Sequence, residues 1–69
     1  MKISARNRLK GKIVEVKKGQ TTAHVRIDVN GAVVTASITN EGVDELGLKP
    51  GQVAYAGLKA SDVMVAIDD

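Results

Sequence analysis

The chain has 69 residues, with 10 Lys and Arg against 8 Asp and Glu, one histidine and no cysteine. At this length a single hydrophobic core is already small, so we expect one domain spanning residues 1–69, stabilised further by self-association. The absence of thiols excludes a disulfide framework, and His24 alone cannot form an ordinary transition-metal site. No apolar stretch is long enough for a signal-peptide core or a membrane span, so we expect a soluble, cytoplasmic protein.

The first predicted strand covers residues 8–17. Apolar residues along the chain alternate with polar ones in short runs between Gly, Asn and Pro, which predicts a mainly β fold. Within the first run Ile13 and Val14 are adjacent, so either a bulge shifts the phase or both faces of the strand are covered.

A hairpin is predicted next. Residues 23–29 alternate strictly between apolar and polar side chains, which is typical of a strand with one face in a core and one in water. Asn30 and Gly31 then predict a type I′ turn, because both central positions of that turn need a positive φ. The third strand is expected over residues 32–39.

A short helix and two more strands complete the predicted order. Thr39 or Asn40 can cap the helix, and Gly47 can end it. A fourth strand is expected over residues 53–59 and a fifth over residues 63–67. Five strands with one short helix between the third and fourth predict a small OB-like barrel.

Charge is distributed unevenly along the chain. Residues 1–26 carry eight Lys or Arg and one acid, whereas residues 41–69 carry two bases and six acids. The basic half suits an anion, or it complements the acidic half of a neighbouring subunit.

Nucleic acid is not favoured as a partner, because Tyr55 is the one aromatic residue available for base stacking. Phosphate contacts remain an alternative, but a solvated face that protects an edge strand is the preferred interpretation of Lys10, Lys12, Lys17 and Lys18.

The residue inventory does not favour an enzyme. We interpret His24 as an exposed structural histidine, because no nucleophile turn or phosphate-binding glycine loop accompanies it. Recognition of a small oxyanion remains as a possible function. Each candidate residue also has an ordinary structural role, as a polar residue before the first strand, a helix cap or a surface charge. The groups suited to it are in Ser4, Arg6, Thr39 and Lys59.

Three stretches resemble a known family in order and spacing. They are "SARNRLKGKI", "ITNEGVDELGLKPG" and "AGLKASDVMVAI", and they are similar to those of the molbindin (Mop) family, a molybdate-binding TOBE-type domain. The resemblance covers essentially the whole chain. It implies an OB-like barrel that assembles into a hexamer, a trimer of dimers, with molybdate and also tungstate bound between subunits for molybdenum storage or homeostasis. The alternative is an OB-like interaction module that binds nucleic acid or a protein without an anion function.

The resemblance also implies roles for individual residues. From "SARN", Ser4 would supply a hydroxyl, Ala5 a backbone N–H and Arg6 a guanidinium. Lys59 of "LKA" would supply an ammonium, and Thr39 would come from a neighbouring chain. No organic cofactor is expected, because the chain lacks an aromatic platform on which a pterin would stack.

The sequence departs from the family pattern at one position of the implied site. Related domains often carry a serine three residues after the threonine, where this chain has Gly42, so the contact there falls to a backbone N–H or water. The anion is expected to be held through its oxygens, with no metal ligated directly by side chains. The full implied oxyanion-binding set is Ser4, Ala5, Arg6, Asn7, Thr39, Gly42, Lys59 and Ala60.

Overall fold

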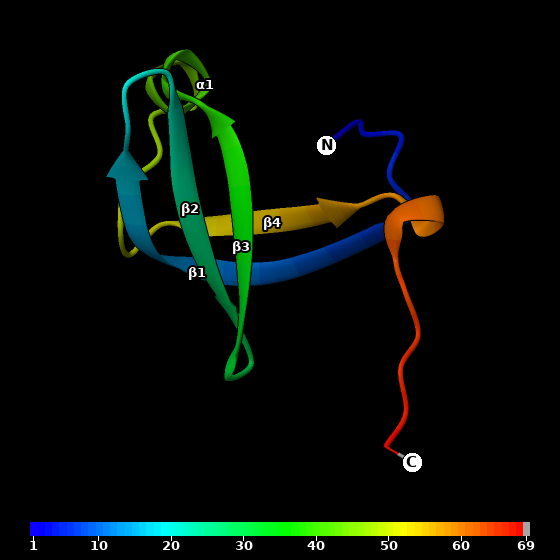
Figure 1. The fold of residues 1–69 in the computed structure, drawn as a ribbon. Coiled ribbons are helices and arrows are strands. Elements are labelled where there is room, and N and C mark those ends of the chain that lie inside the picture. The colour runs from blue at the N-terminus through cyan, green and yellow to red at the C-terminus, as the bar shows by residue number, and fades with distance from the viewer. Residues whose placement is uncertain (69) are drawn as a thin grey trace.

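A computed structural model of the chain describes residues 1–68, which form one antiparallel sheet and two short helices (Figure 1). The strand order in the sheet is β3-β2-β1-β4. The helix α1 lies between β3 and β4 in the chain, where the sequence predicts it. The elements are β1 (Asn7–Lys18), β2 (Thr22–Val29), β3 (Ala32–Thr39), α1 (Asn40–Leu46), β4 (Val53–Leu58) and a 3₁₀ helix, η1 (Ala60–Asp62).

The two halves of the long strand β1 pair with two different neighbours. Its first half, from Asn7 to Lys12, pairs with β4, and its second half pairs with β2. The register with β2 shifts between Ile13 and Glu15, so a bulge at Val14 is the correct one of the two alternatives. As a result β1 and β4 run across the direction of β2 and β3 (Figure 1).

Local signals in the sequence place the hairpin and the helix. Asn30 and Gly31 have φ values of 51° and 93°, which the predicted turn between β2 and β3 requires. Thr39 caps α1, since its hydroxyl accepts the Gly42 N–H at 3.0 Å. Gly47 ends the helix in the left-handed conformation, with φ 62°.

The core is a small apolar cluster between the sheet and α1. In the described part of the chain no polar or charged side chain is buried. The helix contributes one side chain to this cluster, at the end of the sheet where β3 stops. The buried residues are Ile13, Ala23, Val25, Ile27, Val43 and Ala56.

The expectation of a closed five-stranded barrel is wrong for residues 1–68, because they form four strands in an open sheet. Residues 63–67, expected as the fifth strand, run away from the body after η1 (Figure 1). Met64 and Val65 are each 92% exposed. A strand needs a neighbour for its backbone N–H and C=O groups, and this segment has none among the described residues.

The lysines assigned to a solvated face that protects an edge strand are exposed, but they lie on an interior strand of the sheet order. Lys10, Lys12, Lys17 and Lys18 all lie on β1, which pairs with β4 over Asn7–Lys12 and with β2 over Lys12–Lys18, so Lys12 is the one of the four with a paired strand on both sides. The edges of the sheet are β3 and β4, which carry no lysine.

Among the described residues no helix has the length and apolar character needed to cross a membrane.

Candidate oxyanion site

The N-terminal motif and the end of β4 lie side by side. Asn7 pairs with Leu58 at the end of the ladder, and its Nδ2 donates a hydrogen bond to the Leu58 carbonyl at 3.3 Å. The residues one step beyond this pair are Arg6 and Lys59. Two cations therefore leave the same end of the sheet, where the N-terminal segment approaches η1 (Figure 1).

Neither of these cations is neutralised within the described residues. The ion pairs found there are Lys18 with Asp44, at 2.5 Å, and Arg26 with Glu15, at 3.7 Å. Arg6 is exposed and belongs to neither pair. Lys59 is exposed too, and it lines a groove of about 490 Å³ whose lining also includes one acid, Asp62. Both positive charges are therefore available to an anion.

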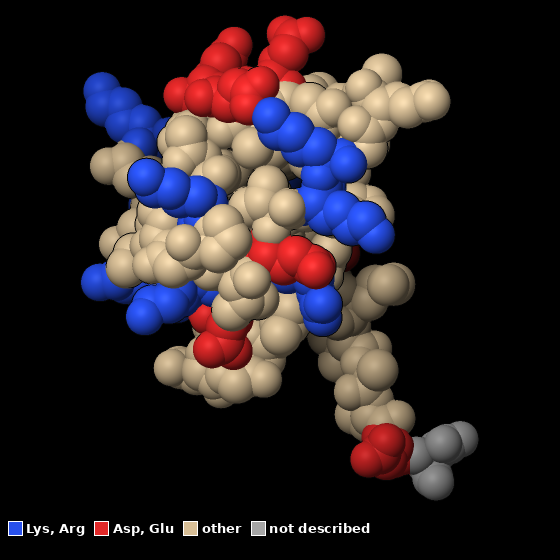
Figure 2. All heavy atoms as spheres, turned by 90° about the vertical axis from the view of Figure 1, so that its left-hand side faces the viewer, with Lys and Arg blue, Asp and Glu red and all other residues tan. Residues whose placement is uncertain are grey.

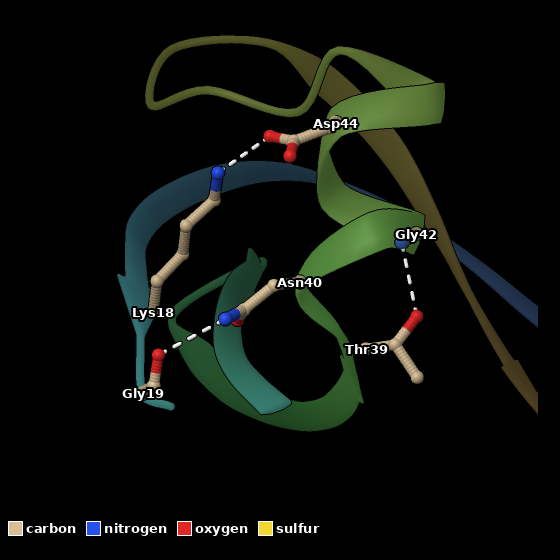
Figure 3. A network of polar contacts seen from close by, with 6 residues as sticks. All are labelled: Lys18, Gly19, Thr39, Asn40, Gly42 and Asp44. Carbon is tan, nitrogen blue, oxygen red and sulfur yellow. Dashed lines mark hydrogen bonds and ion pairs between the residues drawn. The ribbon is translucent and has the colours of Figure 1, made fainter. Parts of the chain in front are cut away.

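Thr39 and Gly42 lie together at the start of α1. The Thr39 hydroxyl oxygen accepts the Gly42 N–H, so its own hydrogen is left to donate to another group (Figure 3). A Cβ at Gly42 would lie 3.2 Å from the Thr39 hydroxyl oxygen, which is a tight contact. The pair thus offers one oriented hydroxyl donor beside a position that has little room for a side chain.

The predicted site residues form two groups at opposite ends of the molecule (Figure 1). One group lies around the start of β1 and the end of β4, and the other lies where β3 meets α1. The described residues of the chain do not bring both groups into one pocket. The first group is Ser4, Ala5, Arg6, Asn7, Lys59 and Ala60, and the second is Thr39 and Gly42.

Comparison with known proteins places this geometry in a family. The TOBE domain family matches residues 3–65. This chain is a TOBE domain of the molbindin (Mop) type. The "Probable molybdenum-pterin-binding protein" of Haemophilus influenzae is 46% identical to this chain over 69 residues. The alignment covers 99% of this chain and 100% of that protein.

Two solved structures have the same fold as this TOBE domain. MopII from Clostridium pasteurianum is 45% identical with a TM-score of 0.88, covering 96% of this chain and 100% of the other. A molybdate binding protein from Sporomusa ovata is 37% identical with a TM-score of 0.91, covering 97% of this chain and all of its own. The OB-like part of the predicted fold is therefore correct, although the described strands number four.

Both signs of charge occur on the face of the TOBE domain that Figure 2 shows. Figure 2 shows acidic side chains gathered on α1 at the top, with Lys and Arg spread below them. Arg26 on β2 pairs with Glu15 on β1, which places an acid among the cations of the sheet. His24 is exposed opposite Lys17, as the interpretation of a structural histidine predicts.

Sequence reasoning missed what Asn40 does in the TOBE domain. It treated Asn40 as an alternative helix cap, whereas the cap is Thr39. The Asn40 side chain instead donates to the Gly19 carbonyl at 2.9 Å, and its oxygen is buried. An asparagine directly after a capping threonine is the available signal, because a cap needs one side chain and the second is free for another contact.

Proposed function

We propose that this TOBE domain binds molybdate, and tungstate by the same chemistry, at a site completed between subunits of a homo-oligomer. Its role is molybdenum storage or homeostasis in the cytoplasm. The observation that carries the proposal is the pair Arg6 and Lys59, two cations without a carboxylate partner in the described chain. Relatives that span the whole chain are named for binding molybdate or a molybdenum-pterin, which supports molybdate as the ligand.

The charges and donors fit a tetrahedral dianion. Arg6 and Lys59 supply the two positive charges that neutralise it, and Ser4 and Thr39 supply hydroxyl donors. Hydrogen bonds to charged groups contribute roughly 1.5–3 kcal/mol each. A few of them are enough for micromolar affinity, which corresponds to about −8 kcal/mol.

The open sheet supports assembly from identical chains. The gap between the edge strands β3 and β4 is flanked by two grooves of about 490 and 410 Å³, lined largely by apolar residues such as Ile27, Ala36 and Ile38. Residues 63–67 form an extended apolar segment of the length of a strand, and they are exposed. We infer that this segment of one subunit fills the gap of another, and that the assembly is the hexamer implied by the family resemblance.

Isothermal titration with molybdate tests the proposed ligand. We expect saturable binding at micromolar concentrations, with sulfate as the matched tetrahedral control at the same ionic strength. No heat of binding at molybdate concentrations up to millimolar would rule out the proposal.

The alternative function, binding nucleic acid through the lysines of β1, differs in its salt dependence. Phosphate-backbone binding weakens steeply as salt rises, because each neutralised phosphate releases counterions. A site that fits one oxyanion loses much less affinity. Binding of a single-stranded oligonucleotide at low salt that weakens steeply as the salt concentration rises, together with no molybdate binding, would favour the alternative.

A further inference from the structure

Thr39 is placed by its neighbour in the chain. Directly after it, Asn40 makes two hydrogen bonds to the turn between β1 and β2, as its N–H donates to the Thr21 carbonyl and its Nδ2 to the Gly19 carbonyl, both at 2.9 Å. The turn is itself closed by the Gly19 N–H, which donates to the Thr22 carbonyl at 2.7 Å. Figure 3 shows the Asn40 side chain reaching from the first turn of α1 to Gly19.

A second contact joins the same elements but holds them less firmly. Lys18 at the end of β1 pairs with Asp44 in α1, and the two side chains are 46% and 65% exposed. Exposed ion pairs contribute little to stability, because water and salt screen them. Asn40 instead makes two hydrogen bonds to the turn, through its N–H and its Nδ2, and neither is an ion pair that salt would screen, so Asn40 is the stronger constraint on the junction of β3 and α1.

We propose that Asn40 is a positioning residue for the oxyanion site and acts through Thr39. By fixing the junction of β3 and α1 to the β1–β2 turn, its amide keeps the Thr39 hydroxyl oxygen against the Gly42 N–H, which leaves the hydroxyl hydrogen free to donate to the anion. The proposal rests on the proposed function, because the group that the Thr39 hydroxyl would meet is the anion. Asn40 itself would touch no ligand, but it sets the position of Thr39, which would.

The first test removes the Asn40 donor and keeps the number and branching of the side-chain heavy atoms. We expect Asn40→Leu to weaken molybdate binding in isothermal titration by about threefold to tenfold, the effect of one lost hydrogen bond. The matched control is the double substitution Lys18→Gln/Asp44→Asn, which cuts the ion pair between the same elements and leaves the net charge unchanged. Its affinity should stay within about twofold of the wild type. If the control loses as much as Asn40→Leu, the proposal is wrong.

A double-mutant cycle separates positioning from general stability. If Asn40 acts through Thr39, Asn40→Leu should cause no further loss of affinity in a Thr39→Val background. An equal loss in both backgrounds would show that Asn40 does not act through the hydroxyl. Should Asn40→Leu fail to fold, Asn40→Ser replaces it, since its shorter side chain does not reach the Gly19 carbonyl.

Amide hydrogen exchange without any anion gives a readout that does not depend on function. We expect Asn40→Leu to speed exchange of the Gly42 N–H by at least about threefold, because this N–H is bonded to Thr39. An unchanged Gly42 exchange rate would overturn the proposal. If wild-type protein binds no molybdate but the Gly42 rate rises, the proposed function fails while the positioning of Thr39 by Asn40 stands.

Discussion

Arg6 and Lys12 are exposed cations with different surroundings, and comparing them tests the site at the level of single residues. Arg6 precedes β1 and lies beside Lys59 at the end of the sheet, whereas Lys12 is within β1. We expect Arg6→Ala to reduce molybdate binding by roughly 2–5 kcal/mol, because in the proposed site between subunits the Arg6 guanidinium and the anion form a buried charge pair. Isothermal titration measures this loss.

Lys12→Ala is the matched control, because it removes the same charge from the same end of the chain. Its affinity for molybdate should remain near that of the wild type. Thermal melting should also show little change for Arg6→Ala, since Arg6 lies outside the strand. Equal losses of affinity for both variants would mean that net charge, and not a site at Arg6, attracts the anion.

At the level of whole strands, Gly11 allows β1 to cross β2 closely. A Cβ at this position would lie 2.4 Å from the Asp28 carbonyl oxygen, so the backbone would have to move. At Gly57 in β4 an added Cβ would instead meet the end of the Ile3 side chain, at 2.7 Å, which can rotate away. We expect Gly11→Ala to destabilise the fold by about 1–3 kcal/mol and Gly57→Ala by clearly less. Urea denaturation of the two variants checks this, and equal midpoints would contradict the packing argument.

Elements with local signals were predictable from the sequence, and those that depend on distant partners were not. The turn at Asn30 and Gly31 and the cap at Thr39 follow from backbone preferences of a few residues, and both are confirmed. The short apolar run in residues 63–67 predicted a strand, but it carries no information about which edge accepts that strand. The interior position of β1 in the sheet order also depends on non-local pairing, so the sequence could not place its lysines relative to the neighbouring strands.

The site shows the same division between local and distant information. The family resemblance supplied the residue set, and the structure adds that Arg6 and Lys59 share one end of the sheet while Thr39 lies at the other. Asn40 was missed because its partner, Gly19, is 21 positions away in the chain. A contact of that kind is visible only once β1, β2 and α1 are in place.

At the scale of the whole molecule the extended C-terminal segment is expected to hold subunits together. A chain ending at Asp62 lacks residues 63–69 but retains all the strands described. We expect it to have a lower mass than the full chain in size-exclusion chromatography with light scattering, because large apolar surfaces lose their partner. A chain ending at Ile67 is the control and should keep the full mass. A chain ending at Asp62 that retains the mass of the full-length assembly would contradict this role.

Subunit mixing tests the shared site most directly. Arg6→Ala chains keep Thr39, and Thr39→Val chains keep Arg6 and Lys59, so a mixed oligomer contains some interfaces with both intact groups. When the two variants are refolded together and titrated with molybdate, random mixing should restore wild-type affinity at roughly a quarter of the sites. Each variant refolded alone should have no site of wild-type affinity. If the mixture binds no better than the two separate variants, the oxyanion site lies within one subunit and the account is wrong.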